Sequence, residues 1–269
     1  MKTLTVFTPT YNRAHTLERL YKSLCAQTCQ DFDWLVIDDG STDGTAALVQ
    51  GFMNEGKIPI RYIYKENGGL YTGYNTAYAN IETELNVCID SDDAMPVDAV
   101  EKIVRLWRQK GSGQYAGITG LDCDMTSMKP LGGRFPEGVS ECFFPELYAK
   151  GIHRGDSKQV MRTDLMKQVS PQIGFPGEKS FNPVYMLLQV TDKFPVLLTN
   201  DCLCLVEYQD KDSMSQGILR QYFDSPRSFA KMRRLELTLK HTTLLNRLRS
   251  AFHFTLESII ALVVCPCRK

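Results

Sequence analysis

Hydrophobic and polar residues alternate in regular blocks along the first 110 residues. Short apolar runs rich in β-branched and aromatic residues are typical of strands, and longer segments with an apolar residue every three or four positions are typical of helices. The sequence predicts strands at Leu4–Thr8, Trp34–Asp38, Ile60–Tyr64 and Leu85–Asp90, and helices around 17–24, at Thr45–Met53, at Tyr71–Asn80 and from Pro96 onward. Strands that alternate with helices in this way predict an α/β fold with βαβ units and a mostly parallel sheet.

The pattern is less regular after residue 110. We expect a strand at 115–124, a mixture of strands, loops and one short helix over 132–169, two short strands meeting at a turn within 195–208, and mainly helix from Ser228 to about Cys265. No strong linker interrupts the earlier part. The predicted organisation is therefore one domain at 1–217 and a basic helical C-terminal extension at 218–269.

Three polar motifs directly follow predicted strands: PTYNR at 9–13, DDGSTDG at 38–44 and DSDD at 90–93. In open sheets of this kind, ligands bind beyond the carboxyl ends of the strands. The motifs should therefore gather at one edge of the sheet, where a nucleotide site is expected.

Each acidic motif has a functional and a purely structural interpretation. An aspartate after the second strand can accept hydrogen bonds from a base or a ribose, but the same motif can be an ordinary turn in which Asp43 caps the next helix. Asp90, Asp92 and Asp93 offer oxygen ligands to a hard cation such as Mg²⁺ or Mn²⁺, but they can equally form a solvated turn.

Composition and charge narrow the class of protein. Of 269 residues, 43% are hydrophobic and 23% are charged, as in soluble globular proteins. The nine cysteines form no regular framework and the start has no pattern typical of a signal peptide, so we expect a reducing cytoplasm. The chain lacks GxGxxG after the first strand and lacks a P-loop motif, which disfavours hydride transfer and P-loop chemistry.

Four stretches together resemble family 2 glycosyltransferases of bacterial type with the GT-A fold: TPTYNR at 8–13, FDWLVIDDGSTDGT at 32–45, NGG at 67–69 and CIDSDDAM at 88–95. The resemblance covers about 3–110. It implies a Rossmann-like sheet flanked by helices, with nucleotide-sugar binding at 1–110 and acceptor binding and catalysis at 111–217. It also implies inverting transfer, with Mn²⁺ or Mg²⁺, from a nucleotide-sugar (a UDP-sugar is favoured) to a glycan or lipid-linked acceptor in cell-surface polysaccharide synthesis.

The resemblance assigns roles residue by residue. The nucleotide-binding set is Thr8, Pro9, Tyr11, Asp38, Asp39, Ser41, Asn67, Gly68, Gly69 and Asp90. Asp92 and Asp93 should hold the metal and the diphosphate, with Asp92 preferred as the direct ligand. His153 or Arg154 could add a positive contact to the leaving group.

The sequence offers two candidates for the general base. An inverting transfer needs a carboxylate that takes the proton of the acceptor hydroxyl. Many relatives carry an acid at a Pro-Glu step after their GEK motif, but here that step is Pro183-Val184. Glu178 is then the first candidate and Asp156 the second. The missing acid also allows an alternative, in which the protein is a non-catalytic member that binds nucleotide-sugars as a partner protein.

The C-terminal extension is distinguished by its charge. Residues 218–269 carry 10 Lys and Arg against 3 Asp and Glu, whereas 1–217 carry 21 against 28. A basic helix followed by an apolar one is typical of peripheral contact with an anionic membrane, here the inner face of the plasma membrane. The alternatives are packing on the domain or a homodimer contact. Nucleic acid is not an expected partner, since the chain is neutral and has no matching motif.

Overall fold

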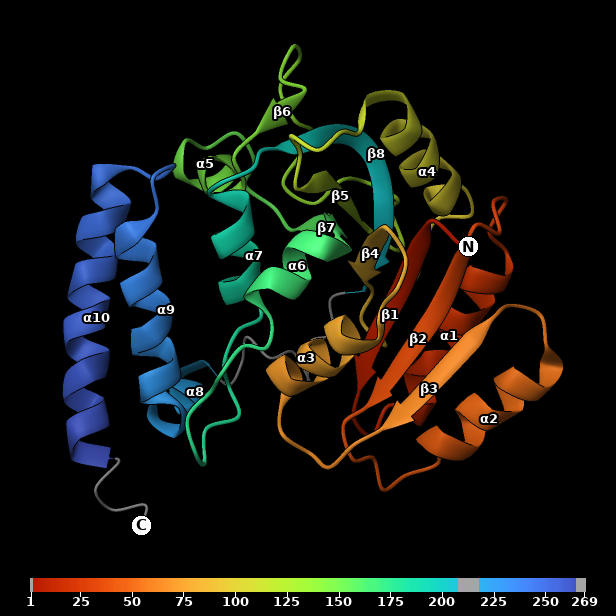
Figure 1. Cartoon of the computed structure of the whole chain (residues 1–269), viewed down its shortest axis with the longest axis horizontal. Helices are drawn as coiled ribbons and strands as arrows, with labels where there is room; N and C mark the ends of the chain where they lie inside the picture. Colours follow the sequence, from red (N-terminus) through yellow and green to blue (C-terminus); the bar gives the residue numbers. More distant parts are fainter. Residues whose placement is uncertain (1, 208–217, 265–269) are drawn as a thin grey trace.

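The computed structural model describes residues 2–207 and 218–264 and contains one eight-stranded sheet of order β3-β2-β1-β4-β7-β5-β8-β6 (Figure 1). Four of the seven neighbouring strand pairs are parallel, namely β1 with β2, β1 with β4, β2 with β3 and β5 with β8. The strands are β1 Leu4–Thr10, β2 Phe32–Asp38, β3 Ile60–Tyr64, β4 Leu85–Cys88, β5 Gly117–Asp124, β6 Glu141–Cys142, β7 Ser157–Arg162 and β8 Val196–Val206. The mixed α/β sheet, mostly parallel, confirms the predicted fold class.

Helices cover both faces of this sheet, and each face has its own apolar core. On one face lie α1 Ala14–Cys25, α2 Thr45–Glu55 and α4 Ala99–Lys110. On the other lie α3 Leu70–Asn80, α5 Phe144–Ala149, α6 Thr163–Val169 and α7 Val184–Thr191. Their apolar residues recur at helical spacing, as Leu17, Leu20 and Leu24 do in α1, and all three are fully buried.

Three further helices follow residue 217: α8 Ile218–Asp224, α9 Pro226–Thr238 and α10 Leu244–Val264. Met232 and Leu235 of α9 pack against the same core as α7. In Figure 1, α10 is the outermost helix on the left, with α9 between it and α7. The predicted helical extension is therefore present, while its separation from 1–217 as a distinct unit stays a prediction.

The structure corrects several element predictions. The segment 195–208 was expected to hold two strands, but its described part is one long strand, β8, whose pairing with β5 shifts register between Thr119 and Leu121. The segment 132–169 contains two short helices, α5 and α6, rather than one. Helix α4 begins at Ala99, so Pro96 precedes it.

Candidate active site

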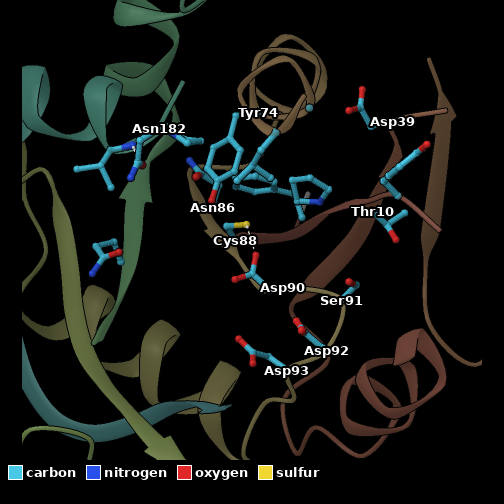
Figure 2. Close-up of a pocket in the computed structure, with 18 of the residues that line it drawn as sticks. Thr10, Asp39, Tyr74, Asn86, Cys88, Asp90, Ser91, Asp92, Asp93 and Asn182 are labelled. Carbon is cyan, nitrogen blue, oxygen red and sulfur yellow. Dashed lines mark hydrogen bonds between the residues drawn. The ribbon is translucent and has the colours of Figure 1, made fainter. Parts of the chain in front are cut away.

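A cavity of about 710 Å³ opens at the carboxyl ends of β1, β2 and β4. Its walls come from the loops after these strands, from α3 and from the segment before α7 (Figure 2). All three predicted motifs contribute to it, at Pro9 and Tyr11, at Asp39, and at Asp90, Asp92 and Asp93. We call it the first cavity. The parallel register of the strands brings these residues together.

Asp39 organises one end of the first cavity. Its carboxylate accepts hydrogen bonds from the backbone N–H of Gly68 at 3.0 Å and of Gly69 at 2.9 Å, and it also pairs with Lys65. The Asn67 side-chain amide donates to the Asp39 backbone carbonyl at 2.9 Å. The NGG loop is therefore folded around this one carboxylate, and Asn67 and Gly69 line the cavity beside it.

Glycine is required at two points of this arrangement. Gly69 has φ +92°, and a Cβ there would lie 2.4 Å from the carbonyl oxygen of Lys179. Gly40 has φ +86°, and a Cβ there would lie 2.8 Å from the backbone nitrogen of Asn67. Side chains would be strained in this left-handed region as well as crowded. These two glycines let the second-strand turn, the NGG loop and the 175–181 segment approach one another closely.

Other predicted nucleotide residues support the cavity from behind and do not line it. The hydroxyl of Thr8 accepts a hydrogen bond from the Trp34 indole N–H at 3.0 Å, within the core. Asp38 is fully buried and accepts from Ser41 N–H at 2.7 Å and from the Tyr62 hydroxyl at 2.6 Å. Burial, helped by the Asp38 carboxylate, raises the pKa of Tyr62. These residues fix the turn rather than facing the space.

At the other end of the cavity, one ammonium group lies between two carboxylates. Lys158, on β7, has its Nζ 3.8 Å from an oxygen of Asp93 and 3.8 Å from an oxygen of Asp122. The Cys204 thiol donates to Asp93 at 3.4 Å. Asp90, Asp92 and Asp93 come from the loop after β4 (Figure 2). Lys158 therefore offsets part of the repulsion within the acidic cluster.

Lys158 does not fully compensate the burial and mutual repulsion of these carboxylates, since the pKa values of Asp93 and Asp122 remain raised. Burial raises the pKa of Asp93 to about 7; repulsion from Asp90 and Asp92 acts in the same direction, and Lys158 opposes it. Burial also raises the pKa of Asp122 to about 6. Burial disfavours the charged form of Lys158, but the neighbouring carboxylates, led by Asp122, raise its pKa well above the usual value. The cluster would thus gain from a further positive charge.

The donor set fits a hard divalent cation shared with a ligand. Among residues 2–207 and 218–264, no three His, Cys, Asp or Glu side chains converge to hold a metal by themselves. Mg²⁺ typically takes one or two carboxylates and completes its shell with phosphate oxygens and water. Asp90, Asp92 and Asp93, at the wall of the first cavity, are the residues that would hold it, in the company of a diphosphate.

A second cavity of about 700 Å³ adjoins the first. The two share lining residues at their junction, namely Asp90, Asp93, Asp156, Lys158, Gln159, Val184 and Val206. Beyond the junction, the second cavity runs between α5 and the C-terminal helices, where Tyr148, Arg233, Arg249 and His253 line it. Two compartments thus meet at the acidic cluster, and the C-terminal extension forms one wall of the second.

The two candidate bases have very different surroundings. Asp156 is exposed at the junction of the cavities. Glu178 lines neither cavity, is 5% exposed, and accepts hydrogen bonds from the backbone N–H groups of Arg227 at 3.2 Å and Ser228 at 2.8 Å. Its carboxylate joins the 175–181 segment to the first turn of α9, which differs from the sequence expectation of a residue facing the acceptor.

The structure also shows where Val184 and His153, two residues singled out in the sequence, lie relative to the cavities. Val184, where many relatives carry an acid, begins α7 and lines both cavities, so the missing carboxylate would have stood at the junction. His153 is buried, packs against Phe135 and contacts the Asp156 carbonyl oxygen at 3.2 Å through Nε2. His153 lines neither cavity and positions the Asp156 loop.

Sequence reasoning missed several site residues. Thr10 lines the first cavity, is 3% exposed, and has a buried hydroxyl without a hydrogen-bond partner among the described residues. Its position two residues before Asn12 in the TPTYNR stretch could have drawn attention to it. Lys158 and Asp122 had no local motif, since they reach the cluster through the antiparallel pairing of β7 with β5.

Comparison with known proteins agrees with this geometry. The family model "Glycosyl transferase family 2" matches residues 5–160, more than half of the chain. The chain is 33% identical over 197 residues to glycosyltransferase GlyA of Streptococcus pneumoniae serotype 4, covering 68% of this chain and 28% of that protein. It is 27% identical over 187 residues to the poly(ribitol-phosphate) beta-N-acetylglucosaminyltransferase TarS of Staphylococcus aureus strain MW2, covering 66% of this chain and 30% of TarS.

Solved structures show the same fold. A crystal structure of Staphylococcus aureus TarS 1–349 with UDP-GlcNAc superposes with a TM-score of 0.69 at 18% identity, over 98% of this chain and 73% of that one. The mannosyltransferase PcManGT of Pyrobaculum calidifontis, bound to GDP-Man and Mn²⁺, gives a TM-score of 0.62 at 15% identity, over 98% and 75%. These likenesses show that the chain has the fold of glycosyltransferases. The chain belongs to glycosyl transferase family 2, and it spans under a third of the length of the two curated relatives.

Proposed function

We propose that the protein transfers a sugar, with inversion at the anomeric carbon, from a nucleotide-sugar to an acceptor hydroxyl. The observation that carries the proposal is the junction of the two cavities at the acidic cluster. A donor in the first cavity would lie with its nucleoside toward Asp39 and its diphosphate toward Asp90, Asp92 and Asp93. An acceptor in the second cavity would then approach the anomeric carbon from the opposite side.

The chain's own groups have distinct tasks in this proposal. Asp39 and Asn67 orient the nucleoside, and Pro9 and Tyr11 close the pocket against water. A bound Mn²⁺ or Mg²⁺ would neutralise charge that develops on the leaving diphosphate. The Nζ of Lys158 lies 3.8 Å from Asp93 and 3.8 Å from Asp122 and offsets part of their repulsion. The acidic cluster can then accept the cation together with the diphosphate. Asp156 takes the proton from the acceptor hydroxyl as the new bond forms.

Asp156 replaces Glu178 as the proposed base because of their positions. Asp156 lies at the junction, where the acceptor oxygen must stand, whereas both oxygens of Glu178 are engaged by α9. A carboxylate held in this way is not available at the reacting centre.

The identity of donor and acceptor is proposed from relatives. A UDP-sugar is favoured because the TarS structure contains UDP-GlcNAc, and the GDP-Man complex of the mannosyltransferase makes GDP-sugars the second choice. The name of TarS, which acts on poly(ribitol-phosphate), supports a cell-surface polysaccharide or a lipid-linked glycan as acceptor class. A cytoplasmic reaction, where nucleotide-sugars are made, completes the proposal.

The test is turnover with Mn²⁺ and a panel of UDP- and GDP-sugars, followed as release of nucleoside diphosphate. Asp156→Asn should lower kcat by about 10²- to 10⁴-fold, the usual contribution of a general base, while the donor dissociation constant is unchanged. Glu178→Gln is the matched control and should retain kcat in the fraction that is folded. An Asp156→Asn variant with wild-type kcat would contradict the assignment.

One observation favours a second candidate, a non-catalytic member that binds donor without turnover. Val184 lines the junction where many relatives carry an acid. This candidate predicts donor binding, no nucleoside diphosphate release, and no effect of either Asp156→Asn or Glu178→Gln. Val184→Glu would then restore the missing carboxylate, and a gain of turnover in this variant alone would favour the second candidate.

A further inference from the structure

Helix α10 exposes much of its apolar surface to solvent, and its two buried residues are both polar. Its inward face carries Glu257, 1% exposed and paired with Arg233 at 3.4 Å, and Ser250, which donates to Glu236 at 2.6 Å. Its outward face is apolar, with side chains 45–75% exposed at Leu244, Leu245, Leu248, Phe252, Leu256, Ile259, Leu262 and Val263. A helix that packs on a protein in water normally has the opposite arrangement.

The exposed apolar side chains form one continuous stripe. Leu245, Leu248, Phe252, Leu256, Ile259 and Val263 follow one another at intervals of three or four residues, which places them on one side of a helix. At about 1.5 Å per residue the stripe is about 27 Å long. Isolated exposed apolar residues are normal, but a contiguous stripe of this kind marks an interaction surface.

Charge identifies the partner. The exposed charged residues of the described helix are Arg247 and Arg249, both basic, and its single carboxylate, Glu257, is buried on the opposite face. The Arg247 guanidinium donates to the Leu239 carbonyl oxygen at 2.7 Å, so the basic side chain left beside the stripe is Arg249, about 100° around the helix from Leu248. Long basic side chains at such positions reach lipid phosphates while apolar neighbours enter the acyl region.

A second copy of the chain matches this surface less well. The stripe of another α10 would offer apolar side chains but no exposed carboxylate to Arg247 or Arg249, in either a parallel or an antiparallel arrangement. An anionic bilayer supplies both the apolar phase and the counter-charge. The 7 positive charges by which Lys and Arg exceed Asp and Glu over 218–269 act in the same direction.

We propose that α10 lies flat on an anionic lipid surface, with the apolar stripe in the boundary between headgroups and acyl chains. No helix within 2–207 and 218–264 is long and apolar enough to cross a membrane. The opposite side of α10 lines the second cavity through Asn246, Ser250 and His253. The cavity wall is thus about one helix diameter, roughly 10 Å, from the lipid. α10 would hold the acceptor compartment beside the membrane surface.

The test is co-sedimentation of the full chain with vesicles of phosphatidylcholine alone or with phosphatidylglycerol added. The wild type should bind the anionic vesicles, and high salt should weaken the binding. Ile259→Glu, within the stripe, should lower the partition coefficient about tenfold or more, since it replaces apolar area with a carboxylate. Ile173→Glu is the matched control, because Ile173 is an exposed isoleucine outside α10 and should leave binding unchanged.

Melting temperature and light scattering keep the test decisive, and neither depends on catalytic activity. Folded wild-type protein that ignores both kinds of vesicle would overturn the proposal, as would an Ile259→Glu variant that binds like wild type. A dimer in the absence of lipid that Ile259→Glu converts to a monomer, without vesicle binding, would assign the stripe to a second copy and would also overturn it.

Discussion

Asp39 shows how a single carboxylate can decide the shape of a ligand pocket. It accepts two backbone N–H groups of the NGG loop, and the loop reaches it only because Gly69 has φ +92° with no side chain. Contacts within the chain therefore hold the Asp39 end of the first cavity, and this end depends on a glycine that need not touch a ligand itself.

Gly69→Ala should consequently abolish or strongly weaken donor binding. A methyl group at this position meets the Lys179 carbonyl oxygen at 2.4 Å, so the NGG loop must move away from Asp39. Isothermal titration with a nucleotide-sugar and Mn²⁺ measures the effect. Gly51→Ala is the control: Gly51 lies in α2 with open space around it, and alanine there should stabilise the protein by about 0.5–1 kcal/mol. Unchanged affinity in Gly69→Ala would refute the role of this loop.

Asp93 predicts the pH dependence of cation binding. Its pKa is raised to about 7, and a carboxylate must lose its proton before it binds a metal. Affinity for Mn²⁺ together with donor should therefore fall below pH 7, by up to about tenfold per pH unit, and level off above it. Asp93→Asn should weaken binding and remove this slope. The same slope in the variant would show that another group titrates.

The raised pKa also has a consequence for stability without a cation. The folded state keeps the Asp93 proton up to about pH 7, whereas the unfolded chain loses it near the ordinary value of 3.8. Between these values the folded state binds more protons, so the free energy of unfolding should decrease as pH rises and then level off. Asp122, with a pKa of about 6, contributes with the same sign. Denaturant titrations at a series of pH values, with EDTA present, check this.

At the scale of elements, the Glu178 side chain ties the first turn of α9 to the 175–181 segment. Its carboxylate accepts two N–H groups at the first turn of α9, where a negative charge also interacts favourably with the helix dipole. Glu178→Gln should lower the free energy of unfolding by about 1 kcal/mol and the melting temperature by about 2–4 °C. The exposed Glu137→Gln serves as control and should shift neither quantity. Equal melting temperatures for the two variants would contradict a stabilising contact between Glu178 and α9.

The N-terminal elements were predictable because local pattern and final structure agree there. Strand β3 lies at the predicted bounds, and β1, β2, α2 and α3 differ by two residues or fewer at either end. Strand β8 was missed as a single element because its Thr-Asn-Asp stretch has the composition of a turn, yet it continues through a register shift against β5. Helix α7 was missed because its short sequence, VYMLLQVT, is apolar at most positions and has no clear helical period.

The residues of the candidate site also differ in how far the sequence predicts them. Asp39 and the acidic cluster follow strands in a recognisable motif, so sequence places them correctly at the sheet edge. Lys158 and Asp122 meet that cluster only because β7 inserts between β4 and β5, a pairing that no local pattern encodes. The order in which we propose the two candidate bases could not come from the sequence for the same reason: Glu178 turns toward α9, a helix 48 or more positions later in the chain.

On the scale of the whole molecule, the two cavities are built by different parts of the chain. The first cavity is built mainly from 1–110 and the second from the later strands and the C-terminal helices, with Asp90, Asp93 and Lys158 at their junction. The C-terminal extension is therefore part of the proposed acceptor compartment as well as the proposed lipid-binding surface.

In the proposed function, the first cavity binds a nucleotide-sugar together with a divalent cation. The most direct measurement is the melting temperature of the chain with a panel of UDP-, GDP- and TDP-sugars, with Mn²⁺ or with EDTA. We expect that at least one donor raises the melting temperature in Mn²⁺, that EDTA removes most of the shift, and that Asp92→Asn does so without unfolding the protein. Well-folded protein whose melting temperature no donor changes, with or without metal, would contradict it.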